Sequence, residues 1–216
     1  MNTKEFQFNK EEIKVIKKLN TPVKIQEFLN SLEINFEETG ETCMSPRMVL
    51  KTKKAHCIEA AMFAAAVMRF HGHPPLILDF ETTPEDEDHV VALFKKDNHW
   101  GAISKTNHAV LRYREPIYKS IRELAMSYFH EYYLFANGKK TLRKISKPIN
   151  LNRFNKKGWM TSEDNIWYIP NYLCDIPHTA LINRSQINNL RRVDPIEITA
   201  GKLVEYQNPN GNKELP

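Results

Sequence analysis

The segment from Cys57 to Phe70 constrains the fold more than any other part of the sequence, because almost every position in it is apolar or small. Only Glu59 and Arg69 carry a charge. A helix that is apolar on most of its sides has to be covered by other elements, whereas a surface helix keeps one polar face. We therefore predict that residues 57–70 form the central helix of the fold, which ends at Gly72 and the two prolines that follow it.

Apolar periodicity and turn residues predict the elements around this helix. In chain order we expect helices over 10–19 and 22–32, a loop over 35–43, helical turns over 45–54, a strand over 76–80, a hairpin of strands 89–94 and 99–104, a helix over 116–135, a strand over 141–146, a helix over 185–192 and a strand over 196–206. This order predicts an N-terminal helical extension over 1–44, a core over 45–147 and a C-terminal extension over 148–216 that packs on the core. Its last ten residues are expected to be disordered.

The register of the predicted hairpin decides how His89 and Ser104 face each other. If Lys96-Asp97 is the two-residue turn, His89 lies directly opposite Ser104; if Asp97-Asn98 is the turn, the two residues are diagonal neighbours. Side chains alternate between the faces of a strand, and both registers keep these two on one face. The hairpin therefore predicts a polar pair whichever turn forms.

Cys57 is expected at the first turn of the central helix, ahead of a strand that begins with His89. A free thiol is only a few per cent ionised at neutral pH, and a helix N-terminus or a neighbouring imidazolium activates it. The same position offers the backbone N–H of Cys57 to an oxyanion, a contribution of roughly 3–4 kcal/mol. The pattern predicts a thiol nucleophile with His89 as general base. The opposing interpretation is that Cys57 is a small buried hydrophobic residue.

Three motifs resemble the transglutaminase-like cysteine superfamily. The run from Lys54, KAHCIEAAMFAAAVMRFHGHPP, is similar to its nucleophile helix, with a cysteine at the start, an alanine-rich face and an arginine near the end. DHVVALF from Asp88 resembles the histidine strand, and WGAIS from Trp100 resembles a Trp-x-x-x-Asp strand. The resemblance covers about residues 45–110. It implies a papain-like α+β fold, with the helix packed on an antiparallel sheet, and cysteine-dependent hydrolysis or transamidation of an amide or peptide.

One position departs from the superfamily pattern, because Ser104 stands where the third strand ends in aspartate. A carboxylate orients an imidazole and stabilises its cation, whereas serine only hydrogen-bonds and asparagine orients without charge. The alternatives are that Ser104 orients His89, that Asn107 does so after the strand has ended, or that the site is inactive. In the last case the chain would be a catalytically inactive transglutaminase-like protein that serves as a binding or scaffold module.

Charge and cysteine usage limit the partners and cofactors we expect. Thirty-one Lys and Arg against 26 Asp and Glu give a net charge of +5, but the basic residues are scattered and no groove-reading motif accompanies them, so no nucleic-acid partner is expected. The acidic run 85–88 lacks a calcium-loop pattern and the cysteines lack Cys-x-x-Cys spacing, so neither a metal nor another cofactor is expected. The expected substrate is a peptide, a protein or a small amide.

We expect a cytoplasmic protein. The longest apolar run, the nine residues 60–68, is far shorter than the roughly 18 residues of a membrane-spanning helix. The three cysteines are widely spaced and odd in number, and residues 1–5 lack a charged-then-apolar leader. The oligomeric state does not follow from the sequence.

Overall fold

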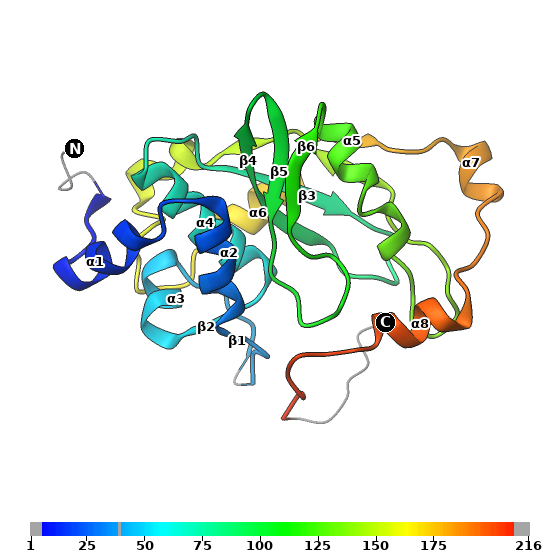
Figure 1. Ribbon diagram of the computed structural model, residues 1–216, viewed down its shortest axis with the longest axis horizontal. Helices are drawn as coiled ribbons and strands as arrows, with labels where there is room; N and C mark the ends of the chain where they lie inside the picture. The colour runs from blue at the N-terminus through cyan, green and yellow to red at the C-terminus, as the bar shows by residue number, and fades with distance from the viewer. Residues whose placement is uncertain (1–5, 39, 210–216) are drawn as a thin grey trace.

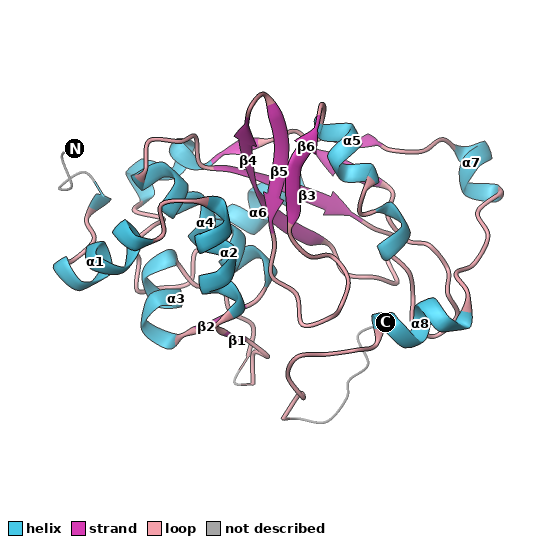
Figure 2. Cartoon of the chain, viewed as in Figure 1, coloured by secondary structure: helices cyan, strands magenta, loops and turns pink. Residues whose placement is uncertain are grey.

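The computed structural model describes residues 6–38 and 40–209, which fold into a mixed α+β structure with an antiparallel sheet. Figure 2 shows the strands near the centre of the molecule, with helices on both sides of them. The elements are α1 (Lys10–Lys18), α2 (Pro22–Asn30), β1 (Glu33–Ile34), α3 (Pro46–Thr52), β2 (Lys54–Ala55), α4 (Cys57–Phe70), β3 (Leu76–Glu81), β4 (His89–Lys96), β5 (His99–Ile103), β6 (Arg114–Tyr118), α5 (Ile121–Met126), η2 (Phe129–Glu131), β7 (Lys144–Ser146), β8 (Ile149–Asn150), η3 (Leu151–Lys157), α6 (Tyr168–Asp175), β9 (His178–Ala180), α7 (Arg184–Asn188) and α8 (Pro195–Gly201).

Seven strands form the main sheet, in the order β6-β5-β4-β3-β7-β9, with β8 paired to β3. Alternate residues of its central strands belong to two different hydrophobic clusters: Val90 and Ala92 to one, Val91 and Leu93 to the other. Because successive side chains of a strand point to opposite faces, the sheet has a core on each face. Figure 1 agrees, with α1 to α4 on one side of the strands and α5 on the other.

Helix α4 is the central helix, as predicted. Every residue from Ile58 to Phe70 except Arg69 is buried. His56 is the N-cap in extended backbone, and the chain leaves the helix through Gly72, whose φ of 87° suits glycine. The helix packs against β4 of the sheet and against α2 and α3. A helix with apolar residues on all sides is stable here because each side has a partner.

The hairpin of β4 and β5 forms around Asp97-Asn98. Both turn residues have positive φ, 48° and 62°, a conformation that Asp and Asn tolerate and that matches the twist of the flanking strands. Ala92 pairs with Ile103 and Lys96 with His99. This is the second of the two predicted registers, in which His89 and Ser104 are diagonal neighbours rather than directly opposed.

The prediction of one long helix over 116–135 is wrong. Pro116 lies in β6, which pairs with β5 and forms one edge of the sheet, where a missing N–H is tolerated. Ser120 then caps the short helix α5 by accepting a hydrogen bond from the Glu123 N–H (3.1 Å). Pairing with the sheet therefore overrides the helical spacing of the first apolar residues.

The strand predicted over 196–206 is also wrong, because residues 195–201 form α8. Asp194 is its N-cap and Pro195 occupies the first turn, a combination that favours helix initiation. The helices predicted over 10–19, 22–32 and 45–54 are present as α1, α2 and α3, and the strand predicted over 141–146 is shortened to β7. The helix predicted over 185–192 is the shorter α7, shifted by one residue at its start. Most of the tail predicted to be disordered lies outside the described residues.

The segments on either side of the expected core contribute to the same hydrophobic cluster as α4. Ile16, Ile25 and Leu29 of the first two helices have no exposed surface and belong to that cluster, as does Trp159. Strands β8 and β9 extend the main sheet. The residues before 45 and after 147 therefore complete the layers that cover α4 and the sheet. Among the described residues, no helix combines the length and the apolar character needed to cross a bilayer.

Candidate active site

Cys57 is the first residue of α4 and remains partly exposed, whereas Ile58 and Glu59 behind it are buried. The first backbone N–H groups of a helix have no partner within the helix, and the aligned peptide dipoles leave partial positive charge there. The His56 N–H donates to Glu59 Oε2 (3.0 Å), which fixes the entry of the chain into the helix. The thiol thus lies at the positive end of a well-anchored helix.

His89 opens β4, and Ser104 follows the end of β5 on the neighbouring strand. The two side chains are hydrogen-bonded, with 2.8 Å between His89 Nε2 and Ser104 Oγ. The Ser104 hydroxyl also donates to the Leu111 carbonyl oxygen (2.6 Å). A serine hydroxyl has one hydrogen, and a carbonyl oxygen only accepts. Ser104 therefore accepts from the Nε2–H of His89, which leaves Nδ1 as the nitrogen that faces other partners.

The side chains of His89 and His56 both act on the Cys57 thiol. Burial by itself would raise the pKa of the Cys57 thiol, but the bonds from these two imidazoles and their charges outweigh it and hold the pKa well below its ordinary value. A lowered pKa favours the thiolate, the nucleophilic form, over the thiol. The structure therefore brings three of the four predicted residues together: Cys57, His89 and Ser104.

Asn107, the fourth predicted residue, has other partners. Its Nδ2 donates to the Tyr206 carbonyl oxygen and its Oδ1 accepts from the Tyr206 N–H, both at 2.9 Å. With both side-chain atoms engaged, Asn107 fastens the C-terminal segment to the loop after β5. The side chain that bonds His89 is Ser104.

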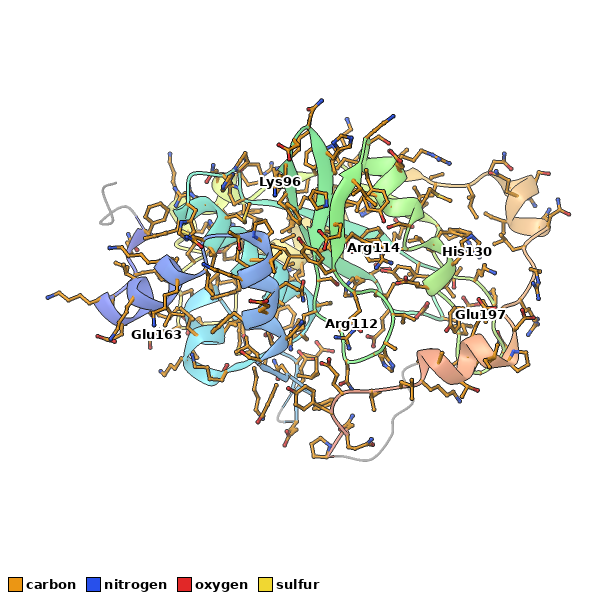
Figure 3. All side chains as sticks on the ribbon, in the orientation of Figure 1. Lys96, Arg112, Arg114, His130, Glu163 and Glu197 are labelled. Atoms are coloured by element: carbon orange, nitrogen blue, oxygen red, sulfur yellow. The ribbon has the colours of Figure 1, made fainter. Side chains whose placement is uncertain are left out.

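The position of Ser104 is fixed from two directions, neither of which the sequence analysis predicts. Gln26 of α2 accepts from the Ser104 N–H (3.0 Å) and donates to the Ser104 carbonyl (2.7 Å). Glu131 accepts from the Leu111 N–H (2.6 Å), and its other oxygen is paired with Arg114 (2.6 Å). Arg114 is the first residue of β6 and is labelled at that strand in Figure 3.

Leu111 itself has a φ of 59°, a left-handed conformation that is unfavourable for a leucine. Such a residue persists only where its surroundings over-determine it. Here the Glu131 carboxylate and the Ser104 hydroxyl hold its N–H and its carbonyl group. The strained residue directs a carbonyl oxygen at Ser104, and this fixes the hydroxyl as the acceptor for His89.

A second network surrounds His56 and was missed by the sequence prediction. The Nε2–H of His56 donates to the Thr42 carbonyl oxygen (3.1 Å), and the same nitrogen lies 3.4 Å from Glu59 Oε1 and 3.5 Å from Glu37 Oε1. Burial would lower the pKa of His56, but the bond to Cys57 and the charges of Cys57 and Glu59 raise it to about 9. The available signal was Glu59, a lone acidic residue in an apolar helix, three residues after His56.

The acidic run before His89 has structural partners. Asp88 Oδ1 accepts from the Thr82 N–H (2.8 Å), Asp86 accepts from the Thr141 hydroxyl, and Glu85 pairs with Lys139 (3.0 Å). Within the described residues, no group of three or more His, Cys, Asp or Glu side chains is arranged to hold a metal ion. The run thus fastens the connection between β3 and β4.

No protein-family model matches this chain, and no curated protein matches it at a significant level. The geometry of Cys57, His89 and Ser104 is therefore the basis on which a function can be assigned.

Proposed function

We propose that this chain is a cysteine-dependent acyl-transfer enzyme of transglutaminase-like type, in which Cys57 is the nucleophile, His89 the general acid and base, and Ser104 the group that orients His89. One observation carries the proposal. His89 is bonded through Nε2 to a buried hydroxyl of fixed direction and acts by hydrogen bonding and by charge on the thiol at the start of α4. A nucleophile, its base and a group that orients the base form the arrangement that nucleophilic catalysis requires.

The arrangement also supports the finer assignment to a papain-like fold. A buried helix begins with the nucleophile and packs on an antiparallel sheet, and adjacent strands of that sheet supply His89 and Ser104. Burial of His89 and Ser104, which are 6% and 3% exposed, keeps water from competing for their hydrogen bond.

The chemistry has two halves. The Cys57 thiolate attacks the carbonyl carbon of an amide, and the Cys57 N–H at the start of α4 stabilises the oxyanion that forms. The C–N bond breaks as protonated His89 gives its proton to the departing amine, which leaves a thioester. Water or a second amine then attacks the thioester, His89 takes the proton from it, and the C–S bond breaks to restore the thiolate. The substrate is a peptide, a protein or a small amide.

A labelling experiment tests this proposal. The protein is treated at neutral pH with an acyl-type thiol probe, and the modified cysteine is located by peptide mapping, in the wild type and in His89→Ala. We expect Cys57 to be acylated much faster than Cys174, the exposed cysteine of α6, and we expect His89→Ala to slow the turnover of that acyl group by roughly 10²–10⁴-fold. Equally slow labelling of Cys57 and Cys174 would refute the enzyme function.

Such a result would favour the alternative of a binding or scaffold module. The observation that favours this alternative is the serine at position 104, where the superfamily pattern has a carboxylate. Serine does not supply the negative charge that stabilises an imidazolium.

A further inference from the structure

We propose that His56 is a second catalytic residue of this site: in its protonated form it is the resident counter-ion of the Cys57 thiolate, and this leaves His89 to exchange protons with the substrate. The inference rests on the proposed acyl-transfer function and divides between two histidines the tasks that a single histidine performs in a simple Cys–His pair.

The bonds of the His56 ring determine which nitrogen meets the thiol. Nε2 lies 3.1 Å from the Thr42 carbonyl oxygen, which only accepts, so Nε2 carries a hydrogen. His56 directly precedes Cys57 and its side chain acts on the thiol by hydrogen bonding and by charge, so we assign to the sulfur Nδ1, the ring nitrogen that Thr42 does not engage. A proton shared between Nδ1 and Sγ gives either a neutral ring beside a thiol or an imidazolium beside a thiolate.

Two carboxylates decide between these forms. Glu59 Oε1 and Glu37 Oε1 lie 3.4 Å and 3.5 Å from His56 Nε2. The Glu59 side chain has no exposed surface, and the surrounding chain saturates it with donors: the Met44 N–H (2.8 Å), the Thr42 hydroxyl (2.9 Å), Asn35 Nδ2 (3.1 Å) and the His56 N–H (3.0 Å). A buried carboxylate held in this way favours a cation beside it, and His56 is in position to be that cation.

The whole electrostatic environment of the pair agrees with this charge distribution. Within residues 6–38 and 40–209, the titratable groups that act on Cys57, on His56 or on both include Glu37, Cys43, Glu59, Asp79, Glu87, His89 and Tyr132. Most of them are acidic, and acidic groups favour a protonated ring and oppose a bare thiolate. Protonated His56 lies between the Cys57 thiolate and the carboxylates of Glu37 and Glu59 and balances the charge of both. Its pKa of about 9 keeps it charged at neutral pH.

This division has a consequence for each half-reaction. In acylation the thiolate forms the S–C bond and protonated His89 delivers its proton to the departing amine, while His56 keeps its own proton. In the second half-reaction neutral His89 removes the proton from water or an amine, and the C–S bond breaks to release a thiolate beside the His56 imidazolium. The sulfur is thus a good leaving group at the moment when His89 is occupied as a base.

The test compares alkylation of Cys57 by iodoacetamide between pH 5 and 9 in four proteins: wild type, His56→Gln, His89→Gln and His71→Gln. His71 is the matched control, since it lies at the other end of the same helix and, like His56, bonds a carbonyl oxygen through Nε2, that of Ile16 at 3.0 Å. Peptide mapping isolates the signal of Cys57, and acyl turnover is measured in parallel.

We expect His56→Gln to slow alkylation at pH 6 at least tenfold, with recovery toward pH 9, because the thiol pKa rises. His89→Gln should slow alkylation less than His56→Gln does but slow acyl turnover by roughly 10²–10⁴-fold, and His71→Gln should behave as the wild type. Fast alkylation at pH 6 in His56→Gln, or equal losses in His56→Gln and His89→Gln, would overturn the division of roles. If Cys57 in the wild type reacts no faster than Cys174, the proposed function fails together with this inference.

A second measurement covers the case in which His56→Gln does not fold. Imidazole NMR signals of the wild-type protein report the charge of His56 directly. Its ring should be doubly protonated at pH 7, and alkylation of Cys57, which removes the anion, should lower the pKa of His56 by at least one unit. An unchanged titration of His56 after alkylation would refute the ion pair.

Discussion

Replacing Ser104 by aspartate introduces the carboxylate of the transglutaminase-like pattern that the sequence resembles, and we predict that it impairs the site. The Ser104 hydroxyl makes two bonds of opposite kind, since it accepts from His89 Nε2–H and donates to the Leu111 carbonyl oxygen at 2.6 Å. An ionised carboxylate accepts the first bond but has no hydrogen for the second. It would place an anionic oxygen close to a carbonyl oxygen that Glu131 and the local backbone hold in place.

The magnitude follows from burial. A buried carbonyl that loses its donor costs about 1–3 kcal/mol. A new charge at a residue that is 3% exposed adds a desolvation cost that pairing with His89 only partly offsets. We expect Ser104→Asp to lose at least about 2 kcal/mol of the free energy of unfolding at pH 7, out of the roughly 5–15 kcal/mol usual for a domain. If the His89 ring shifts by about 1 Å to relieve the contact, acylation of Cys57 slows by roughly 10²-fold.

Three variants separate the causes. Ser104→Thr keeps a hydroxyl and serves as the matched control, Ser104→Ala removes both bonds, and Ser104→Asp removes only the donated one. Urea unfolding gives the stability, and the burst of p-nitrophenol released from p-nitrophenyl acetate gives the acylation rate. We expect the rate of Ser104→Thr to lie closest to that of the wild type. If Ser104→Asp is as stable as the wild type and is acylated as fast or faster, the assignment of the two hydrogen bonds is wrong.

Two further predictions concern the sheet. In Gly101→Ala the new methyl group would overlap the Phe94 ring and approach the Arg114 carbonyl oxygen to 2.8 Å. We expect the free energy of unfolding, measured in urea, to fall by about 1–3 kcal/mol. An unchanged midpoint of urea unfolding would contradict the packing. Burial raises the pKa of Asp79 from 3.8 to about 6 despite its hydrogen bond to His178. Between these two pH values the native state holds a proton that the unfolded chain has released. The free energy of unfolding therefore falls by up to roughly 3 kcal/mol as the pH rises from about 4 to about 6. Asp79→Asn should remove this dependence, so a stability difference from the wild type that stays constant between pH 4 and pH 7 would refute it.

The contacts of Ser104 also explain how a serine could replace a carboxylate in an active Cys–His site. A lone serine hydroxyl rotates and orients an imidazole poorly, but here the Leu111 carbonyl fixes the direction of its hydrogen, and Gln26 fixes its backbone. What serine does not supply is negative charge beside the imidazolium. In the proposed division of roles His56 carries the lasting positive charge, and Glu37 and Glu59 balance it.

The sequence by itself determined the elements whose cause is local. Asn9, Thr21 and Ser45 each cap a helix by accepting the N–H three residues later, and the all-round apolar character of residues 57–70 marked the buried helix. The alternation of strand side chains required only that His89 and Ser104 share a face. These features depend on neighbours within a few residues, so the local order of residues is sufficient to encode them.

Only the tertiary structure decided the surroundings that give the site its chemistry. Gln26 meets Ser104 across 78 positions of sequence, and Asn35 meets Glu59 across 24. Pairing within the sheet places the turn of the β4–β5 hairpin at Asp97-Asn98. It also places Pro116 in an edge strand, although the apolar spacing after Pro116 is helical. Contacts of this kind exist only after the layers have packed, because no periodicity within one segment specifies which distant side chain fills a given position.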